Sequence, residues 1–336
     1  MAQVTDYKGI ILNTYSYWSK TLKNDFLKKI GISDVEQIKS IDDVNKLKEI
    51  YMNFSEYDFE LNYSYNFLFE ITNLDETFEL IKNNFFEDKF NSNTLEYLST
   101  ILEKPILKQN ENKLELKFSK IIKDLSGKLI KLPIILNFYL EEKFLHLKIR
   151  ILPEKFTLEK KEMEEFYLNI ITEIKKWCSN LNIRLNNYDI FKNSVDIFKD
   201  SFYKKEGLDR INPVAFNCNN NSLGIIRIRK DQNNIMPILT ELKIMADKFK
   251  DEKDKEILDK YLEDLLNNVD YYKIYIEWLF NSRGKRTKKV DFYFNRKYKN
   301  SGMTLIYIES NNRKQEEKDD VIKFISSYKK QNSLSS

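Results

Sequence analysis

KFLHLKIRIL, residues 143–152, alternates apolar and polar side chains from Leu145 to Ile151. A period of two is that of a β-strand, and a strand with one apolar face turns that face to a core and the other to solvent or a partner. The stretch therefore predicts a half-buried strand. Its apolar face carries Leu145, Leu147, Ile149 and Ile151, and its polar face carries His146, Lys148 and Arg150.

Two further apolar stretches precede this strand. The stretches 114–122 and 129–140 are joined by DLSGK, and a tight EEK turn leads into 143–152. Short turns join antiparallel neighbours, so the three segments predict an antiparallel meander. The helical period over 157–181 predicts a helix that covers the apolar face of the last strand.

Helical periods dominate the N-terminal region. Apolar residues three or four apart over 5–30, followed by Gly31, predict one amphipathic helix with a left-handed cap. Ser33 and Glu36 are spaced as a capping box before a second helical stretch that reaches Phe54. The segments predicted next are a strand at 63–71 and helices at 73–85 and 95–102.

The C-terminal half returns to strands. DIFK occurs at 189 and again at 196, which places Phe191 and Phe198 on one face of a helix over 189–202. Strands and helices occur in blocks, so we predict an α+β fold with antiparallel sheets and two domains, 1–187 and 188–336. The other expected segments are an Asn-rich loop around Cys218, a strand at 223–229, two helices flanking DEKDKE at 251–256, strands at 272–280, 289–296 and 303–310, and a helix at 315–330.

The composition excludes several classes of protein. With 42% hydrophobic residues the chain can build a core, so its 32% charged residues are typical of a solvated surface rather than of a disordered chain. No stretch reaches the ~18–20 apolar residues of a membrane span. The N-terminal sequence lacks the pattern of a signal peptide, and the two cysteines have no paired spacing. We therefore expect a cytoplasmic protein with no membrane contact.

Cofactor and metal motifs are missing. The seven glycines are too far apart for a dinucleotide fingerprint or a P-loop, and a structural zinc site needs about four Cys or His ligands where the chain has three. His146 is predicted to lie on the surface, Cys178 to pack in a helix, and Cys218 to be an inert loop thiol. We predict no cofactor, no metal and no nucleotide.

The segment RGKRTKKVDFYFNRKYK, residues 283–299, holds eight basic residues against Asp291, a local charge of +7. A basic hairpin with interleaved aromatic rings is typical of a site that follows phosphates and stacks on bases. In a chain this rich in lysine, a solvated turn is the alternative. The candidate nucleic-acid contacts are Arg283, Lys285, Arg286, Lys288, Lys289, Phe292, Arg296, Lys297 and Tyr298.

Three carboxylates give a second candidate site. Glu277, Asp291 and Glu309 are spaced along 277–330 in a way that resembles the PD-(D/E)xK nucleases, and the resemblance implies Mg²⁺ held by Asp291 and Glu309. The chain departs from that family because Asn311 replaces the lysine, no proline precedes Asp291, and alternation around Glu277 predicts a strand rather than a helix. The register, which the sequence leaves open, decides whether the carboxylates share a face.

We therefore expect a non-catalytic intracellular binding protein that contacts nucleic acid through 283–299, in host defence or a mobile element. No ordered divalent ion is expected at Asp291 and Glu309, because the lysine of the nuclease pattern is missing. One alternative is a Mg²⁺-dependent nuclease, or a decayed relative of one, that uses Asp291, Glu309 and Glu277. The other is a protein-interaction module.

Overall fold

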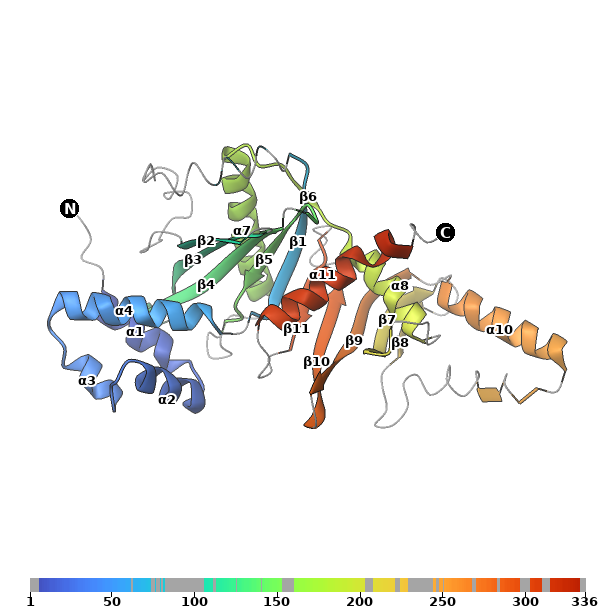
Figure 1. Ribbon diagram of the computed structural model, residues 1–336, viewed down its shortest axis with the longest axis horizontal. Helices are drawn as coiled ribbons and strands as arrows, with labels where there is room; N and C mark the ends of the chain where they lie inside the picture. Colours follow the sequence, from blue (N-terminus) through green and yellow to red (C-terminus); the bar gives the residue numbers. More distant parts are fainter. Residues whose placement is uncertain are drawn as a thin grey trace. The chain divides into compact units, whose positions relative to one another are not determined.

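The computed structural model shows an α+β fold with antiparallel strands (Figure 1). The grouping of helical and strand periods along the sequence predicts this fold class. Contacts divide the chain into two compact units: unit 1, with 1–63 and 68–186, and unit 2, with 64–67 and 187–336. No helix in the described part is both long and apolar enough to cross a membrane. The structure describes residues 6–61, 63–73, 76, 79, 81, 106–110, 113–124, 126–139, 141–152, 160–202, 208–220, 224–228, 244–245, 248–249, 251–267, 270–282, 285–296, 303–309 and 315–332.

The sheet of unit 1 confirms the predicted meander. Strands β3 (Lys113–Lys123), β4 (Leu129–Tyr139) and β5 (Phe144–Ile149) are adjacent and antiparallel. An additional strand, β2 (Ile106–Asn110), pairs with β3 and was not predicted. β1 (Tyr65–Ile71), predicted as a strand, lies beside β5, and the Ile71 amide donates to the Lys143 carbonyl at 3.0 Å.

Helix α7 (Lys160–Asn180) lies on the apolar face of the meander, as expected. Lys120 of β3 pairs with Glu173 of α7, with 2.5 Å between Nζ and Oε2. The same face carries Leu116, Leu136 and Leu147, which the register places in one row. All three leucines are fully buried.

The opposite face of the meander is buried too, which corrects the prediction that His146 lies on the surface. His146 is 0% exposed and Lys148 is 1% exposed. Helix α4 (Val44–Phe59) packs on this face, where Phe59 contacts Ile135. A strand can alternate apolar and polar residues and still lie between two layers when its polar groups find partners inside the protein.

The N-terminal region is helical, but not as one helix over 5–30. The chain breaks into α1 (Tyr7–Ser16) and α2 (Lys20–Lys29), because the Ser19 hydroxyl accepts from the Leu22 amide and starts a new helix. Gly31 has φ +69°, the left-handed cap predicted for it. The next helix, α3 (Val35–Lys39), is capped by Asp34 rather than by Ser33.

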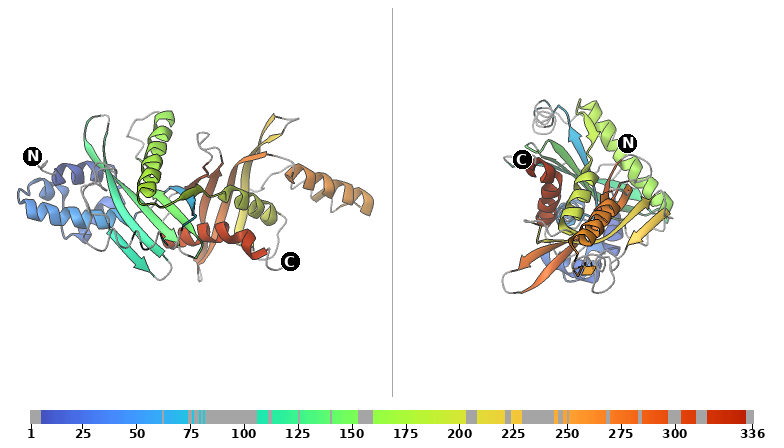
Figure 2. Two further views of the ribbon diagram at one scale, coloured as in Figure 1. Left: turned by 90° about the horizontal axis from the view of Figure 1, so that it is seen from above. Right: turned by 90° about the vertical axis from the view of Figure 1, so that its right-hand side faces the viewer.

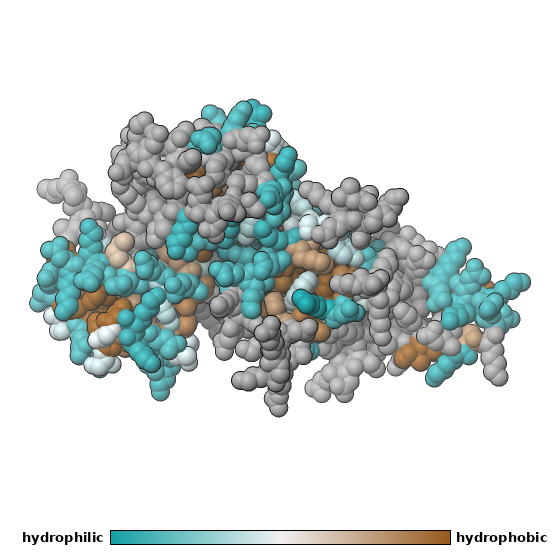
Figure 3. Space-filling model, in the orientation of Figure 1, coloured by the Kyte–Doolittle hydropathy of each residue, from teal (hydrophilic) through white to brown (hydrophobic). Residues whose placement is uncertain are grey.

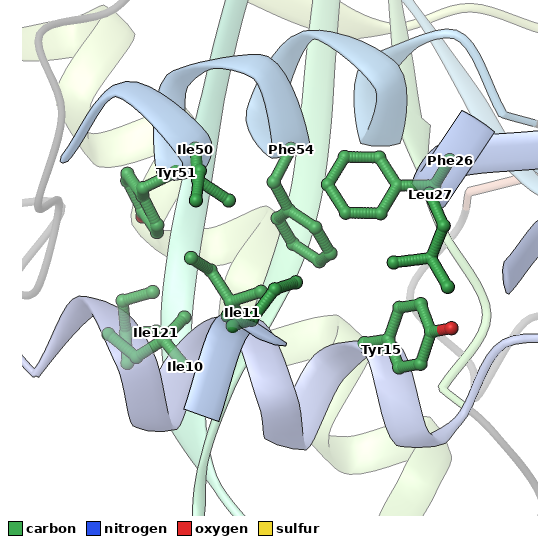
Figure 4. Close-up of a cluster of buried hydrophobic side chains, with 10 residues drawn as sticks. Ile10, Ile11, Tyr15, Phe26, Leu27, Ile50, Tyr51, Phe54 and Ile121 are labelled. Carbon is green, nitrogen blue, oxygen red and sulfur yellow. The ribbon is translucent and has the colours of Figure 1, made fainter. Parts of the chain in front are cut away.

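These helices share one apolar cluster with β3. Phe54 of α4 lies at its centre, with Phe26 of α2 edge-on at 5.3 Å between ring centroids (Figure 4). Ile121 of β3 joins the cluster and ties the helices to the meander. Figure 3 shows mostly hydrophilic residues on the outside of these helices, with apolar residues visible between them. The cluster explains why short helices are stable here.

The sheet of unit 2 has the strand order β8, β7, β9, β10, β11, and β11 pairs with the first residues of β1. The three strands predicted from 272 onward are confirmed; β9 is longer than predicted, β10 begins four residues earlier, and β11 is shorter. The strands are β7 (Ile211–Asn220), β8 (Gly224–Ile228), β9 (Asp270–Ser282), β10 (Lys285–Asn295) and β11 (Leu305–Ile308), and a short β6 (Leu185–Asn187) pairs with β1.

Helices α8 (Ile190–Phe202) and α11 (Gln315–Asn332) lie together on one face of the unit 2 strands (Figures 1 and 2). The Asn193 side chain donates to the Ser326 carbonyl at 2.8 Å. Trp278 of β9 meets Phe324 of α11 with 5.2 Å between ring centroids. From residue 274 onward, the even-numbered residues of β9, and those of β10 beside them, therefore point toward these helices, and Tyr271, beyond a register shift in β9, packs on Phe198 of α8.

Two predictions in unit 2 are wrong. The Asn-rich segment around Cys218 is strand β7, not a loop, because β8 and β9 pair with its backbone whatever its side chains are. DEKDKE is not a break between helices, because α10 (Glu252–Asn267) begins at its second residue. The helix expected at 95–102 and nearly all of that at 73–85 lie outside the described residues.

Candidate functional site

The hairpin of β9 and β10 decides the register that the sequence leaves open. Asp291 lies opposite Glu277 on β9. On the other side, the Glu309 amide donates to the Asp291 carbonyl at 3.1 Å, next to the pair Phe292 and Ile308. The three acidic residues therefore lie side by side on one face, and we call them the carboxylate row. The nuclease pattern needs Asp291 and Glu309 on a shared face, and they have one.

A second row lies two residues further along the same face. Tyr275, Tyr293, Tyr307 and Tyr65 follow one another across β9, β10, β11 and β1. The rings of Tyr275 and Tyr293 are stacked at 4.2 Å, and Tyr307 lies 5.6 Å from Tyr293 and 6.0 Å from Tyr65. We call these four residues the tyrosine row, and the two rows together the acid–tyrosine face.

The acid–tyrosine face is the side of the unit 2 strands away from α8 and α11. Val290, Phe292 and Phe294 of β10 are at most 1% exposed on the helix side. The four tyrosines and Asp291 are half-buried, and Glu309 is exposed. The even-numbered side of β10 is the one toward α8 and α11, whereas on the acid–tyrosine face Glu277 is only 8% exposed and Glu309 is reached by solvent.

The carboxylates of this face repel one another. Burial, followed by the neighbouring carboxyl groups of Glu309 and Glu277, raises the pKa of Asp291 above its usual value, and the Tyr275 hydroxyl offsets part of this. The Tyr293 hydroxyl donates to Glu309 Oε2 at 3.3 Å. Asp291 Oδ1 is buried and accepts no hydrogen bond within the described structure. Asp291 Oδ1, at the centre of the face, can therefore still accept a hydrogen bond.

Lys289 joins the carboxylate row to the basic segment. Its ammonium lies 3.1 Å from Glu277 Oε2, and its side chain is 50% exposed. Lys285 and Lys288 belong to β10 on the way to the turn, and their backbones pair with Ser282 and Phe280. Lys285, Lys288 and Lys289 thus belong to the turn end of the hairpin, which we call the basic hairpin, whereas Arg296 follows the opposite end of β10.

The structure describes only part of the candidate nucleic-acid contacts. Arg296 is exposed, and its amide donates to the Tyr272 carbonyl at 3.0 Å. Phe292 is 0% exposed and lies between Ile276 and Ile308 on the helix-covered side of the sheet, so its ring offers no surface for stacking on a base. Outside the described residues lie Arg283, Lys297, Tyr298 and the side chains of Lys285, Arg286 and Lys288.

The other chemistry-bearing residues are buried or paired. Burial raises the pKa of the Cys178 thiol, which is 0% exposed, so the thiol stays protonated and unreactive. Glu115 of β3 pairs with Lys117 at 2.9 Å. Among the residues that the structure describes, no group of three or more His, Cys, Asp or Glu side chains is arranged to hold a metal ion.

The tyrosine row was missed in the sequence analysis, although a signal was present. YIE occurs at 275–277 and again at 307–309, and the strand between them carries the reversed spacing as DFY at 291–293. Reversal on the middle strand of an antiparallel meander brings tyrosine beside tyrosine and acid beside acid. The pattern therefore predicts both rows once the three strands are known to be neighbours.

Comparisons with known proteins supply no analogue for this face. The chain matches no family model, no curated protein and no solved structure. The resemblance to the PD-(D/E)xK nucleases is therefore carried by the spacing of Glu277, Asp291 and Glu309 alone. Functional assignment depends on the basic hairpin and the acid–tyrosine face themselves.

Proposed function

We propose that the protein binds nucleic acid without cleaving it, and that the basic hairpin is the principal contact. The observation that supports this most directly is the hairpin itself. β9 and β10 pair over 13- and 11-residue strands, and five of the eight basic residues of the segment, Arg283, Lys285, Arg286, Lys288 and Lys289, fall where the sequence passes from β9 into β10. Phosphates are bound by such concentrations of Lys and Arg, and the binding is largely independent of sequence.

The carboxylate row limits where the phosphates can run. Asp291 and Glu309 lie one row beyond Lys289, on the same face. A phosphate chain that crossed this row would meet like charge, so its path should stay at the turn end of the hairpin. The proposed setting is the cytoplasm, in host defence or a mobile element.

The salt dependence of binding tests this proposal. Each phosphate neutralised on a duplex contributes a slope of roughly 0.9 in log affinity against log salt. Replacing Arg283, Arg286 and Lys289 with Ala is expected to weaken duplex binding uniformly across sequences and to lower the slope by about one per lost contact. Fluorescence anisotropy with labelled duplexes over a salt series measures both quantities.

A matched control is available in the charge-balanced run near α10. Replacing Lys250, Lys253 and Lys255 with Ala removes the same charge from a place with no concentration of basic residues, and binding is expected to change little. If these substitutions weaken binding as much as those in the basic hairpin, the hairpin is not a specific site. Unchanged binding by the hairpin variant would likewise exclude the proposal.

The shared face of Asp291 and Glu309 favours one second candidate, a Mg²⁺-dependent nuclease. Two adjacent carboxylates are the minimum for holding a divalent ion against a scissile phosphate. Lys289 lies on this face and could stand in for the lysine that Asn311 replaces. Mg²⁺-dependent cleavage by the wild type, lost on Asp291→Asn, would establish the nuclease; intact substrate over long incubation supports binding alone.

A further inference from the structure

The acid–tyrosine face combines two kinds of group at the spacing of a β-sheet. Neighbouring strands lie about 4.8 Å apart, and residues two apart along a strand are separated by roughly 6.7 Å. A planar group of that size can reach a carboxylate in one row and a ring or hydroxyl in the other. The pairs Asp291 with Tyr293 and Glu309 with Tyr307 have this relation.

The charge of this face is opposite to that of the whole chain. The chain carries a net charge of +4, whereas the carboxylate row holds three acids and one basic neighbour, Lys289. The ion pair of Lys289 with Glu277 shows that the row takes up an ammonium group. Glu309 is exposed and accepts a hydrogen bond from the Tyr293 hydroxyl at 3.3 Å, so a ligand can reach its carboxylate from solvent.

We propose that the acid–tyrosine face docks an arginine-bearing segment of a protein partner. Charge complementarity selects a cationic segment and disfavours a phosphate chain. Arginine fits better than lysine because a guanidinium is flat, binds a carboxylate through two parallel hydrogen bonds and packs against aromatic rings. This contact lies beside the basic hairpin and does not depend on nucleic-acid binding there.

Binding of synthetic peptides to the full chain tests the proposal. The probes are fluorescein-labelled peptides of alternating arginine and serine, of lysine and serine, and of glutamate and serine, followed by fluorescence anisotropy at low salt. We expect the arginine peptide to bind several-fold more tightly than the lysine peptide and the glutamate peptide not to bind at this face. Equal affinity for arginine and lysine would overturn the assignment to arginine.

Isosteric variants locate the binding site. Asp291→Asn combined with Glu309→Gln keeps the shape of both side chains and is expected to weaken arginine-peptide binding at least tenfold, as loss of about one charged hydrogen bond would do. The control is Glu252→Gln with Glu256→Gln on the exposed surface of α10, which should leave binding unchanged. If the control loses as much as the double variant, or the double variant binds like the wild type, the face is not the site.

Lys289→Ala separates this proposal from the proposed function. Removal of Lys289 takes one positive charge away from the carboxylate row, so arginine-peptide binding should strengthen while duplex binding weakens. Arginine-peptide binding that weakens or stays the same would contradict docking on this face, whatever happens to the duplex. Displacement of the peptide by Mg²⁺, beyond that by NaCl of equal ionic strength, would assign the face to a metal ion instead.

Discussion

Asp291 is the residue at which the register matters most, because it lies between Glu277 on one neighbouring strand and Glu309 on the other. Had β10 paired one residue out of register, Asp291 would point toward α11 and Phe292 would lie on the open face. The buried position of Phe292 shows that apolar burial chose the register. Burial of the apolar neighbours therefore holds the carboxylate row in place. The electrostatic repulsion among its three carboxylates opposes this arrangement.

Asp291→Asn is expected to stabilise the protein at neutral pH. The pKa of Asp291 is raised in the folded state above 3.8, so the folded chain holds its proton more tightly than the unfolded chain does. Stability from this proton is present below the unfolded pKa and is lost as the pH rises through the folded pKa. Urea unfolding of both proteins from acidic to neutral pH should show the variant gaining over the wild type as the pH rises. A constant difference across that range would contradict the raised pKa.

The ion pair of Asp58 with Arg150 is the second residue-scale feature. Asp58 of α4 is 0% exposed and accepts from the Arg150 guanidinium, and this pair ties the helix to the polar side of β5. Asp58→Ala leaves Arg150 without this partner and is expected to cost about 3–5 kcal/mol in urea unfolding. The control is Asp42→Ala, since Asp42 pairs with Lys8 at 3.3 Å with a side chain 97% exposed. Its cost should stay below about 1 kcal/mol.

At the scale of elements, the turn between β4 and β5 is strained. Lys143 has φ 59°, a left-handed conformation that costs a residue with a side chain roughly 1–2 kcal/mol. Lys143→Gly removes this strain but adds entropy to the unfolded chain, so a net gain of up to about 1 kcal/mol is expected. Equilibrium urea unfolding measures the gain.

The matched control for this turn is Lys128→Gly at the turn between β3 and β4. Lys128 is exposed and does not have positive φ, so glycine brings only the entropy cost there. We expect the control to lose roughly 0.4–1 kcal/mol. If both variants lose stability by a similar amount, the left-handed conformation of Lys143 stores no strain.

At the scale of the whole molecule, β1 belongs to both units. Its residues Ser64–Phe67 group with unit 2 and those from Leu68 with unit 1. Tyr65 and Asn66 pair with β11, and the Ile308 amide donates to the Ser64 carbonyl at 2.9 Å. Neither unit is therefore a continuous piece of chain, and a cut at 187 removes a strand from unit 2.

A fragment of residues 187–336 is expected to self-associate. Without Tyr65 and Asn66, β11 becomes an edge strand with unpaired backbone groups, and such edges pair with other chains. Size-exclusion chromatography with light scattering should show oligomers. Fusing 63–71 to the fragment through a flexible linker should restore a monomer, whereas the linker alone should not. A monomeric fragment without the strand would show that β11 needs no partner.

The periodicity of apolar residues was sufficient to predict most helices and strands, but it did not predict β7 in the interior of the sheet. The meander and the three C-terminal strands follow from apolar residues at every second position, and α7, α8 and α11 follow from apolar residues three or four apart. Each pattern marks the face that the element buries. β7 was not predicted because its Asn side chains give no apolar alternation. The strand is held in the sheet by backbone hydrogen bonds to β8 and β9. The break after α1 was missed because an apolar stripe continues across it, while Ser19 starts the new helix.

The sequence by itself determined the α+β class, the charge of the basic hairpin and the exclusion of the common nucleotide and zinc motifs, because composition and spacing are properties of the chain alone. Only the tertiary structure decided that His146 is buried, that Phe292 is inside, and that Glu277, Asp291 and Glu309 share a face with four tyrosines. The physical reason is that register depends on how both faces of a strand are covered. β10 buries Val290, Phe292 and Phe294 on the face that it shares with Trp278 of β9, which packs on α11, and this leaves Asp291 on the other face.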